Sequence, residues 1–188
     1  MTFRLAMWSG PRNISTAMMR SWENRADTSV ADEPFYACYL KTTGIQHPMF
    51  DEVLRSQSAD WQVVADQLVR GDCETPVFYQ KHMTHHMLPG VDLAWTKHLA
   101  HVFLIRHPAE VVASYAQKRE TFSADDIGII RQWALYQEIS ECTGQVIPVL
   151  NAKRVLQNPR EALGELCGNL GLSFSDEMLS WPVHSLIS

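Results

Sequence analysis

The sequence predicts a three-layer α/β/α protein in which helices cover both faces of a central, mostly parallel sheet of five strands. Short apolar runs alternate along the chain with longer segments whose apolar residues recur at helical spacing. Such alternation is typical of strand–helix–strand units, which build parallel sheets. No internal repeat is visible, and 188 residues suit one domain, so we expect a single domain over residues 1–188.

Apolar runs predict the strands. The run "HVFLI" is continuously apolar, as expected of a strand that helices cover on both faces. Pro76 marks the turn before another run, "VFYQ". The predicted strands are residues 3–8, 28–33, 77–80, 101–105 and 145–150.

Amphipathic segments between these strands predict the helices. Ser15 or Thr16 is placed to cap the first helix. Pro108 suits the first turn of a later one, and Gly171 suits the end of the last. The predicted helices are residues 15–25, 34–42, 49–57, 59–70, 108–117, 124–141 and 159–170.

The composition argues against several classes of protein. Apolar residues make up 46% and charged residues 20%, which is ordinary for a soluble globular protein. The net charge of -5 disfavours a general nucleic-acid or anionic-membrane surface, although it permits a local basic pocket. No apolar run approaches the length of a signal peptide or membrane span, and the four scattered cysteines suit free thiols. We therefore expect a cytoplasmic protein that binds neither nucleic acid nor a membrane.

Charged and titratable residues follow four of the predicted strands. They are the segment "SGPRNIST" at 9–16 and the pairs Asp32-Glu33, Lys81-His82 and Arg106-His107. Doubly wound sheets bind their ligands at the carboxyl ends of the strands, so we expect an active site there. Polar residues also gather wherever strands meet solvent, and the pattern alone leaves that alternative open.

The segment at 9–16 has the composition of an anion-binding loop. Gly10 permits close approach of the backbone, and the N–H groups at the start of the next helix favour an anion. Arg12 adds a planar fork of donors that suits phosphate or sulfonate oxygens, and Ser15 and Thr16 add hydroxyls. A plain helix cap beside a solvated arginine would give the same residues, so the loop alone supports both interpretations.

The same loop departs from an ATP-binding loop. That loop requires Gly-Lys before its final Ser or Thr, whereas Ile14-Ser15 precedes Thr16 in this chain. An ordinary kinase or ATPase is therefore disfavoured.

Four segments together resemble the sulfotransferase family, whose members take a sulfonyl group from 3'-phosphoadenosine 5'-phosphosulfate (PAPS). They read "WSGPRNISTAMMRSW", "VFYQKHMT", "VFLIRHPAEVVASY" and "LQNPREALGELCGNLGL", and the resemblance runs from about residue 3 to about residue 175. It implies a P-loop-NTPase-like topology with the first strand between the third and the fourth. It also implies PAPS as co-substrate, no metal, and a small-molecule acceptor with a hydroxyl or amine.

The resemblance implies a nucleotide site. "RHPAEVVASY" is similar to the family's 3'-phosphate segment, so Arg106 and Ser114 would hold the 3'-phosphate. Arg12 stands in place of a lysine, and Ala17 in place of a tryptophan that stacks on adenine in many members. The 5'-phosphosulfate loop would comprise Gly10, Pro11, Arg12, Asn13, Ile14, Ser15 and Thr16.

The acceptor hydroxyl needs a general base, and the resemblance offers two. Glu33, in "DEPFY", is similar to the carboxylate base of the carbohydrate-sulfotransferase branch. His82, in "QKHMT", is similar to the catalytic histidine of the cytosolic branch, with a spacing that is one residue short. The local pattern favours Glu33 slightly, and both remain candidates. Lys81 would supply a second positive charge beside Arg12.

The chain also departs from the family. It reads as an abbreviated, bacterial-type member, because its end, "LSWPVHSLIS", lacks the basic, glycine-containing segment that normally covers the nucleotide. We expect fewer 3'-phosphate contacts and less of a lid, and a homodimer is one way to cover the exposed surface. Two alternatives therefore stay open: a sulfotransferase-like protein that binds an anion or partner without transfer, and a small-molecule kinase on the same framework.

The acceptor site is expected between two regions rich in aromatic and apolar residues. Residues 35–60 and 83–97 would form its walls, which suits an acceptor with an apolar or aromatic body. The histidines of "HMTHH" have no evident third ligand nearby, so we expect no metal there.

Overall fold

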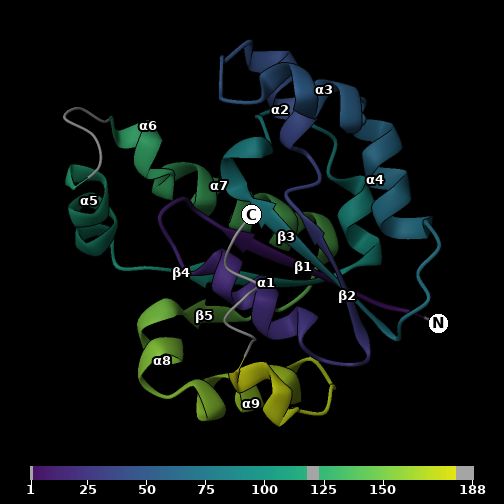
Figure 1. Ribbon diagram of the computed structural model, residues 1–188, viewed down its shortest axis with the longest axis vertical. Helices are drawn as coiled ribbons and strands as arrows, with labels where there is room; N and C mark the ends of the chain where they lie inside the picture. The colour runs from purple at the N-terminus through teal and green to yellow at the C-terminus, as the bar shows by residue number, and fades with distance from the viewer. Residues whose placement is uncertain (1, 118–122, 181–188) are drawn as a thin grey trace.

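A five-stranded, wholly parallel sheet forms the centre of the computed structural model, which describes residues 2–117 and 123–180. Its strand order, β2-β3-β1-β4-β5, places the first strand between the third and the fourth (Figure 1). The predicted α/β class and this order are therefore confirmed. The strands are β1 (Phe3–Ser9), β2 (Thr28–Asp32), β3 (Val77–Met83), β4 (Ala100–Ile105) and β5 (Val149–Asn151).

Helices cover both faces of the sheet (Figure 1). One face carries α1 (Ser15–Glu23), α8 (Ala152–Gln157), α9 (Pro159–Asn169) and the short turn η3 (Asp176–Leu179). The other face carries α2 (Tyr36–Thr43), α4 (Trp61–Arg70), α7 (Ile129–Thr143) and the turns η1 (Thr84–His86) and η2 (Ala94–His98). The remaining helices are α3 (Phe50–Ser56), α5 (Pro108–Ala116) and α6 (Ala124–Ile127).

The central strand β1 contributes to the two cores in alternation. Leu5 and Met7 pack under α1 and α9, whereas Ala6 and Trp8 pack under α4 and α7, and all four are fully buried. Successive side chains of a strand point to opposite faces, so a strand buried on both faces must be apolar throughout. This requirement explains the continuous apolar run near the N-terminus.

Two predicted strand boundaries are wrong. Strand β3 continues past residue 80 to Met83, because Ser9 at the end of β1 still pairs with Met83. Lys81 and His82 therefore lie inside the strand instead of following it. Strand β5 comprises only 149–151, because Pro148 before it has no N–H to donate and offers only its carbonyl to Phe103.

Three helix predictions also change. The predicted helix at 124–141 is divided at Gly128, whose φ of 72° ends α6 before α7 begins. Helix α8 was not predicted, because its six residues are too few to show helical periodicity. Neither Ser15 nor Thr16 caps α1, whose N-cap residue is Ile14.

Three further expectations concern the cysteines, membrane-spanning helices and the end of the chain. The four cysteines are free, as predicted, and Cys38 and Cys167 are buried. Within residues 2–117 and 123–180, no helix has both the length and the apolar character to cross a membrane. The expectation about a missing lid falls on residues 181–188, which lie outside the described residues.

Candidate functional site

Asn13 fixes the loop between β1 and α1 through two hydrogen bonds of its side chain. Its side-chain Nδ2 donates to the carbonyl of Leu104 at 3.0 Å, and its Oδ1 accepts the N–H of Ile14 at 2.9 Å. Arg12 has a left-handed backbone with φ of 56°. No side chain in the described part of the chain caps α1, so the N–H groups of its first turn remain available for an anion.

The back of the loop packs closely against the start of α7. A Cβ on Gly10 would lie 3.1 Å from Oε1 of Gln132, whose Nε2 donates to the Leu104 carbonyl at 2.9 Å. A Cβ on Gly128 would lie only 2.8 Å from Cδ of Pro11. Gly128, with its positive φ, is therefore required for α7 to approach the loop this closely, whereas a side chain at position 10 would have to displace the end of Gln132.

The residues predicted to bind the two ends of a nucleotide lie in direct contact. Nε of Arg12 donates to Oγ of Ser114 at 3.0 Å. The guanidinium of Arg106 donates to the carbonyl of Arg12 at 2.8 Å and pairs with Glu110 at 3.2 Å. Because β1 and β4 are neighbours, their carboxyl ends bring both arginines to one place. The structure thus joins the two segments into one cationic site.

A second polar cluster lies at the ends of β2 and β3. Nζ of Lys81 lies 2.7 Å from Asp32 and 2.6 Å from Oε1 of Glu33. The side chain of Lys81 is only 4% exposed, whereas that of Glu33 is 29% exposed. The backbone of Glu33 is left-handed, with φ of 47°. Two carboxylates therefore compensate the buried ammonium of Lys81, and its position fixes that of Glu33.

The other predicted base, His82, lies on the opposite face of the sheet from Lys81. It is 2% exposed and stacks on Trp8 with ring centroids 4.4 Å apart. Its Nε2 lies 3.2 Å from Oε1 of Gln80. Burial, with a further contribution from His101, lowers the pKa of His82 to about 3. The structure thus encloses His82 in a core while Glu33 keeps contact with solvent.

His86 lies beside Glu33, and the sequence interpretation did not include it among the candidate site residues. Its Nε2 lies 3.9 Å from Oε2 of Glu33, and its side chain is 4% exposed. The ring stacks on Tyr36 and Tyr39, at centroid distances of 5.2 and 4.9 Å. Burial, followed by neighbouring His85, lowers the pKa of His86 to about 2. The signal in the sequence was its position soon after a strand, but the histidines of "HMTHH" were considered only as metal ligands, and no metal was expected there.

A hollow of about 390 Å³ lies beside His86, and we call it the α2 hollow. Except for Trp61, its lining residues come from the two regions that the sequence predicts to form an acceptor site, 35–60 and 83–97. Among the residues that line it, none carries a charged aspartate, glutamate, lysine or arginine side chain. The lining includes Phe35, Cys38, Tyr39, Trp61, His86 and Met87.

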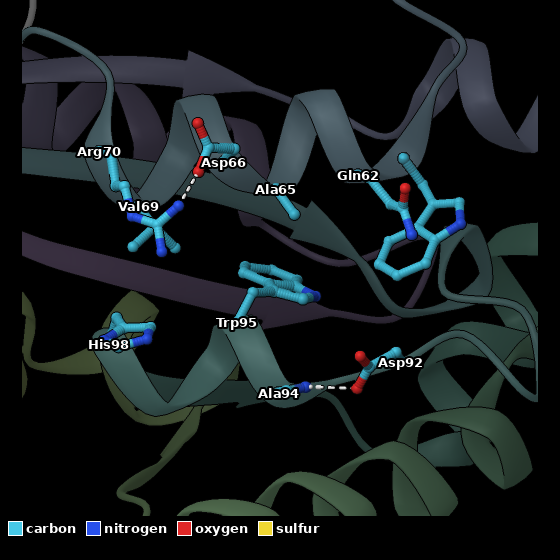
Figure 2. A pocket seen from close by; sticks show the side chains of 10 residues that line it. Gln62, Ala65, Asp66, Val69, Arg70, Asp92, Ala94, Trp95 and His98 are labelled. Carbon is cyan, nitrogen blue, oxygen red and sulfur yellow. Dashed lines mark hydrogen bonds and ion pairs between the residues drawn. The ribbon is translucent and has the colours of Figure 1, made fainter.

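Two further hollows lie elsewhere. One of about 180 Å³ opens beside Ala17, between α1, α8 and α9, and its lining includes Ile14, Leu156 and Pro159. Another, of about 310 Å³, lies between α4 and η2 (Figure 2). In Figure 2 Asp66 and Arg70 pair with each other on its rim, and the indole of Trp95 lies between the two elements. None of the loop or strand-end residues lines the hollow of Figure 2.

In the part of the chain that the structure describes, no three histidine, cysteine, aspartate or glutamate side chains gather where they could hold a metal ion.

Comparison with known proteins shows the family of the chain. A family model described as a sulfotransferase domain matches residues 3–188. Branched-chain-amino-acid aminotransferase-like protein 1 of Arabidopsis thaliana is 32% identical over 174 residues, which cover 93% of this chain and 31% of that protein. The chain therefore spans about a third of that relative's length.

Solved structures share the fold. A sulfotransferase from Alicyclobacillus acidocaldarius superposes with a TM-score of 0.59 at 12% identity, over 98% of this chain and 88% of that one. A mouse sulfotransferase complexed with PAP superposes with a TM-score of 0.52 at 10% identity, over 94% of this chain and 61% of that one.

Proposed function

Because the chain belongs to the sulfotransferase domain family, we propose that it transfers a sulfonyl group from PAPS to a hydroxyl or amine of a small molecule. The family match confirms the resemblance that the four sequence segments indicated. The observation that carries the proposal is the contact between the loop and the segment after β4. Arg12 binds Ser114, and Arg106 binds the Arg12 carbonyl, so one site can receive both phosphate ends of the donor.

The loop and α5 would hold the two anionic groups. The uncapped N–H groups of α1 and the guanidinium of Arg12 suit the 5'-phosphosulfate. Arg106 and Ser114 suit the 3'-phosphate, and the present partners of Arg106 are the Arg12 carbonyl and Glu110. Each guanidinium offers several donors, so these contacts leave others for a ligand.

The hollow beside Ala17 would take the adenine. A tryptophan at that position would fill the space, whereas alanine leaves an apolar recess of about 180 Å³. Leu156 and Pro159 form part of its wall, and Leu156 is 66% exposed although it is large and apolar. Burial of these side chains under a planar base would remove apolar surface from water.

The chemical step needs charge stabilisation and a base. Negative charge develops on the bridging oxygen of the leaving phosphate, where preorganised N–H groups and Arg12 would stabilise it. Glu33 would receive the acceptor proton, because it lies at a strand end, is partly exposed, and is held by Lys81. The buried position of His82 supports a structural role for that residue.

Thermal denaturation with separate ligands tests the donor site. We expect 3',5'-adenosine bisphosphate to raise the melting temperature of the wild type more than ATP or sulfate does. Arg106→Ala should remove most of this shift, and Arg20→Ala, which alters a partly exposed arginine paired with Glu23, should keep it. No shift with the bisphosphate would refute PAPS use, and a shift with ATP alone would favour the kinase.

Turnover separates an active enzyme from a binding protein on the same fold. Release of adenosine bisphosphate from PAPS should depend on Glu33, and Glu33→Gln should slow it by about 10²- to 10⁴-fold. A bisphosphate shift without any PAPS turnover would support the inactive alternative. If Glu33→Gln and His82→Ala both turn over PAPS at the wild-type rate, the acid–base scheme is wrong.

A further inference from the structure

We propose that His86 relays the acceptor's proton to Glu33, and that the α2 hollow receives an alcohol or phenol with an apolar body. This inference rests on the proposed sulfonyl transfer and extends it to a second catalytic residue and an acceptor class. It starts from a geometric gap: Glu33 does not line the α2 hollow, whereas His86 does. His86 also faces Glu33, so it connects the hollow to the carboxylate.

The two ring nitrogens of His86 have different surroundings. Nε2 lies 3.9 Å from Oε2 of Glu33. Nδ1 is buried and has no hydrogen-bond partner among the described residues. A buried polar atom without a partner is destabilising, so such atoms are rare unless a ligand or water completes their hydrogen bonding. An acceptor hydroxyl in the hollow would supply the missing partner.

The surroundings keep the ring neutral and fixed. With a pKa of about 2, His86 is uncharged at neutral pH, so one nitrogen carries a proton and the other accepts one. A proton on Nε2 faces the carboxylate of Glu33, which leaves Nδ1 as the acceptor. The stacked rings of Tyr36 and Tyr39 hold the imidazole in this plane. The imidazole of His86 is therefore suited to pass a proton from Nδ1 to Nε2 and poorly suited to remain protonated.

The bonds, electrons and protons of the transfer balance as follows. The acceptor oxygen forms a bond to sulfur as the bond from sulfur to the 5'-phosphate oxygen breaks, and that oxygen keeps the electron pair. The acceptor's proton moves to Nδ1 of His86 while the proton on Nε2 moves to Oε2 of Glu33. The 3.9 Å separation must shorten to about 2.6–3.2 Å for this step, as catalytic contacts often do when substrate binds.

The lining of the α2 hollow selects the acceptor class. Its volume of about 390 Å³ lies within the range of small-molecule sites, roughly 300–1,000 Å³. The walls are aromatic and aliphatic, and the lining lacks charged side chains other than a titratable histidine. A sugar would leave most of its hydroxyls without partners there, which is costly, whereas an aromatic or aliphatic alcohol would not.

Chemical rescue tests the relay. PAPS turnover is measured with 2-naphthol and, in parallel, with water as the acceptor, for the wild type and for His86→Ala. We expect kcat for 2-naphthol to fall at least 100-fold in His86→Ala and to recover at least tenfold with added imidazole. Glu33→Gln should not recover with imidazole, because the final proton acceptor is then absent. His98→Ala, which removes an exposed histidine of η2, is the control and should match the wild type.

The outcomes separate the relay from the proposed function. The bisphosphate melting shift shows whether each variant is folded and binds the donor, and His86→Gln replaces His86→Ala if that protein is unfolded. Full activity in a folded His86 variant, or loss without imidazole rescue of His86→Ala, would overturn the relay while sulfonyl transfer stands. Wild type that binds the bisphosphate but transfers to neither 2-naphthol nor water overturns the relay and the acceptor class, whereas wild type without a bisphosphate shift overturns PAPS use as well. Faster transfer to N-acetylglucosamine than to 2-naphthol would overturn the acceptor class.

Discussion

Acid should destabilise this fold through histidines that are buried in the neutral form. Burial lowers the pKa of His101 to about 4 from an ordinary value of 6.5, although its bond to the Thr96 carbonyl acts in the opposite direction. Because the folded pKa is the lower one, the stabilisation is complete above pH 6.5 and is lost as the pH falls toward 4. At pH 5 only the unfolded chain is protonated at this residue. The expected loss between pH 7 and pH 5 is then about 2 kcal/mol, from about 1.4 kcal/mol per pH unit.

Three other histidines add to this effect. Burial lowers the pKa of His82 to about 3, of His85 to about 4 and of His86 to about 2. The four contributions have the same sign, so we expect the free energy of unfolding to fall between pH 7 and pH 5 by more than His101 alone accounts for.

Urea denaturation at pH 7 and pH 5 checks the contribution of a single histidine. His101→Gln should be less stable than the wild type at pH 7, because Nδ1 of His101 accepts from Trp8 and Nε2 bonds to the Thr96 carbonyl. Its free energy of unfolding should then fall by about 2 kcal/mol less than that of the wild type on going to pH 5. Ile147→Val removes one buried methylene and should cost about 1 kcal/mol at both pH values. Equal pH dependence in the wild type and His101→Gln would refute the reasoning.

Three further substitutions test the frame around the site by urea denaturation. Oδ1 of Asp60 accepts hydrogen bonds from the N–H groups of Gln62 and Val63 and so caps α4. Asp60→Ala removes this cap and should lower the free energy of unfolding by about 1 kcal/mol. An unchanged free energy of unfolding would show that the cap does not stabilise the protein. Gly128→Ala strains a left-handed residue and pushes on Pro11, so it should cost about 1–3 kcal/mol and also reduce the melting shift with adenosine bisphosphate. An unchanged melting shift with adenosine bisphosphate would show that the packing of α7 does not affect ligand binding at the loop. Arg25 is 5% exposed and donates two hydrogen bonds to the carboxylate of Asp27. Arg25→Lys cannot form both bonds and should lower the free energy of unfolding by about 1–3 kcal/mol. A change near zero would contradict the bidentate geometry.

The sequence allowed the sheet order to be predicted because motif segments mark the ends of particular strands. Once "SGPRNIST" and "RHPAEVVASY" are assigned to one family, their strands must be neighbours, as β1 and β4 are. Boundaries were harder to predict, since they depend on partners far away in the chain. Strand β3 continues to Met83 only because Ser9 pairs with it, and α7 begins where Gly128 meets Pro11.

The sequence placed several candidate site residues at strand ends, but it did not include His86 and did not show how these residues contact one another. Sequence spacing placed Arg12, Arg106 and Glu33 near strand ends, where the structure has them. It could not show that Arg12 turns to Ser114, because that direction follows from a left-handed backbone. Nor could it separate Glu33 from His82, since alternation along a strand assigns opposite faces only after the strand's length is known.

The backbone at Arg12 has a consequence for anyone who evolves this protein in the laboratory. A non-glycine residue in the left-handed region is strained by about 1–2 kcal/mol, and Arg12 and Glu33 are two of the three such residues among those described. A screen that rewards heat resistance alone would therefore accept glycine at position 12, although the proposed donor site would lose one of its two guanidinium groups. Heat resistance and activity should thus be selected together. A thermostable variant that carries Arg12→Gly would have gained stability by relief of backbone strain and lost activity.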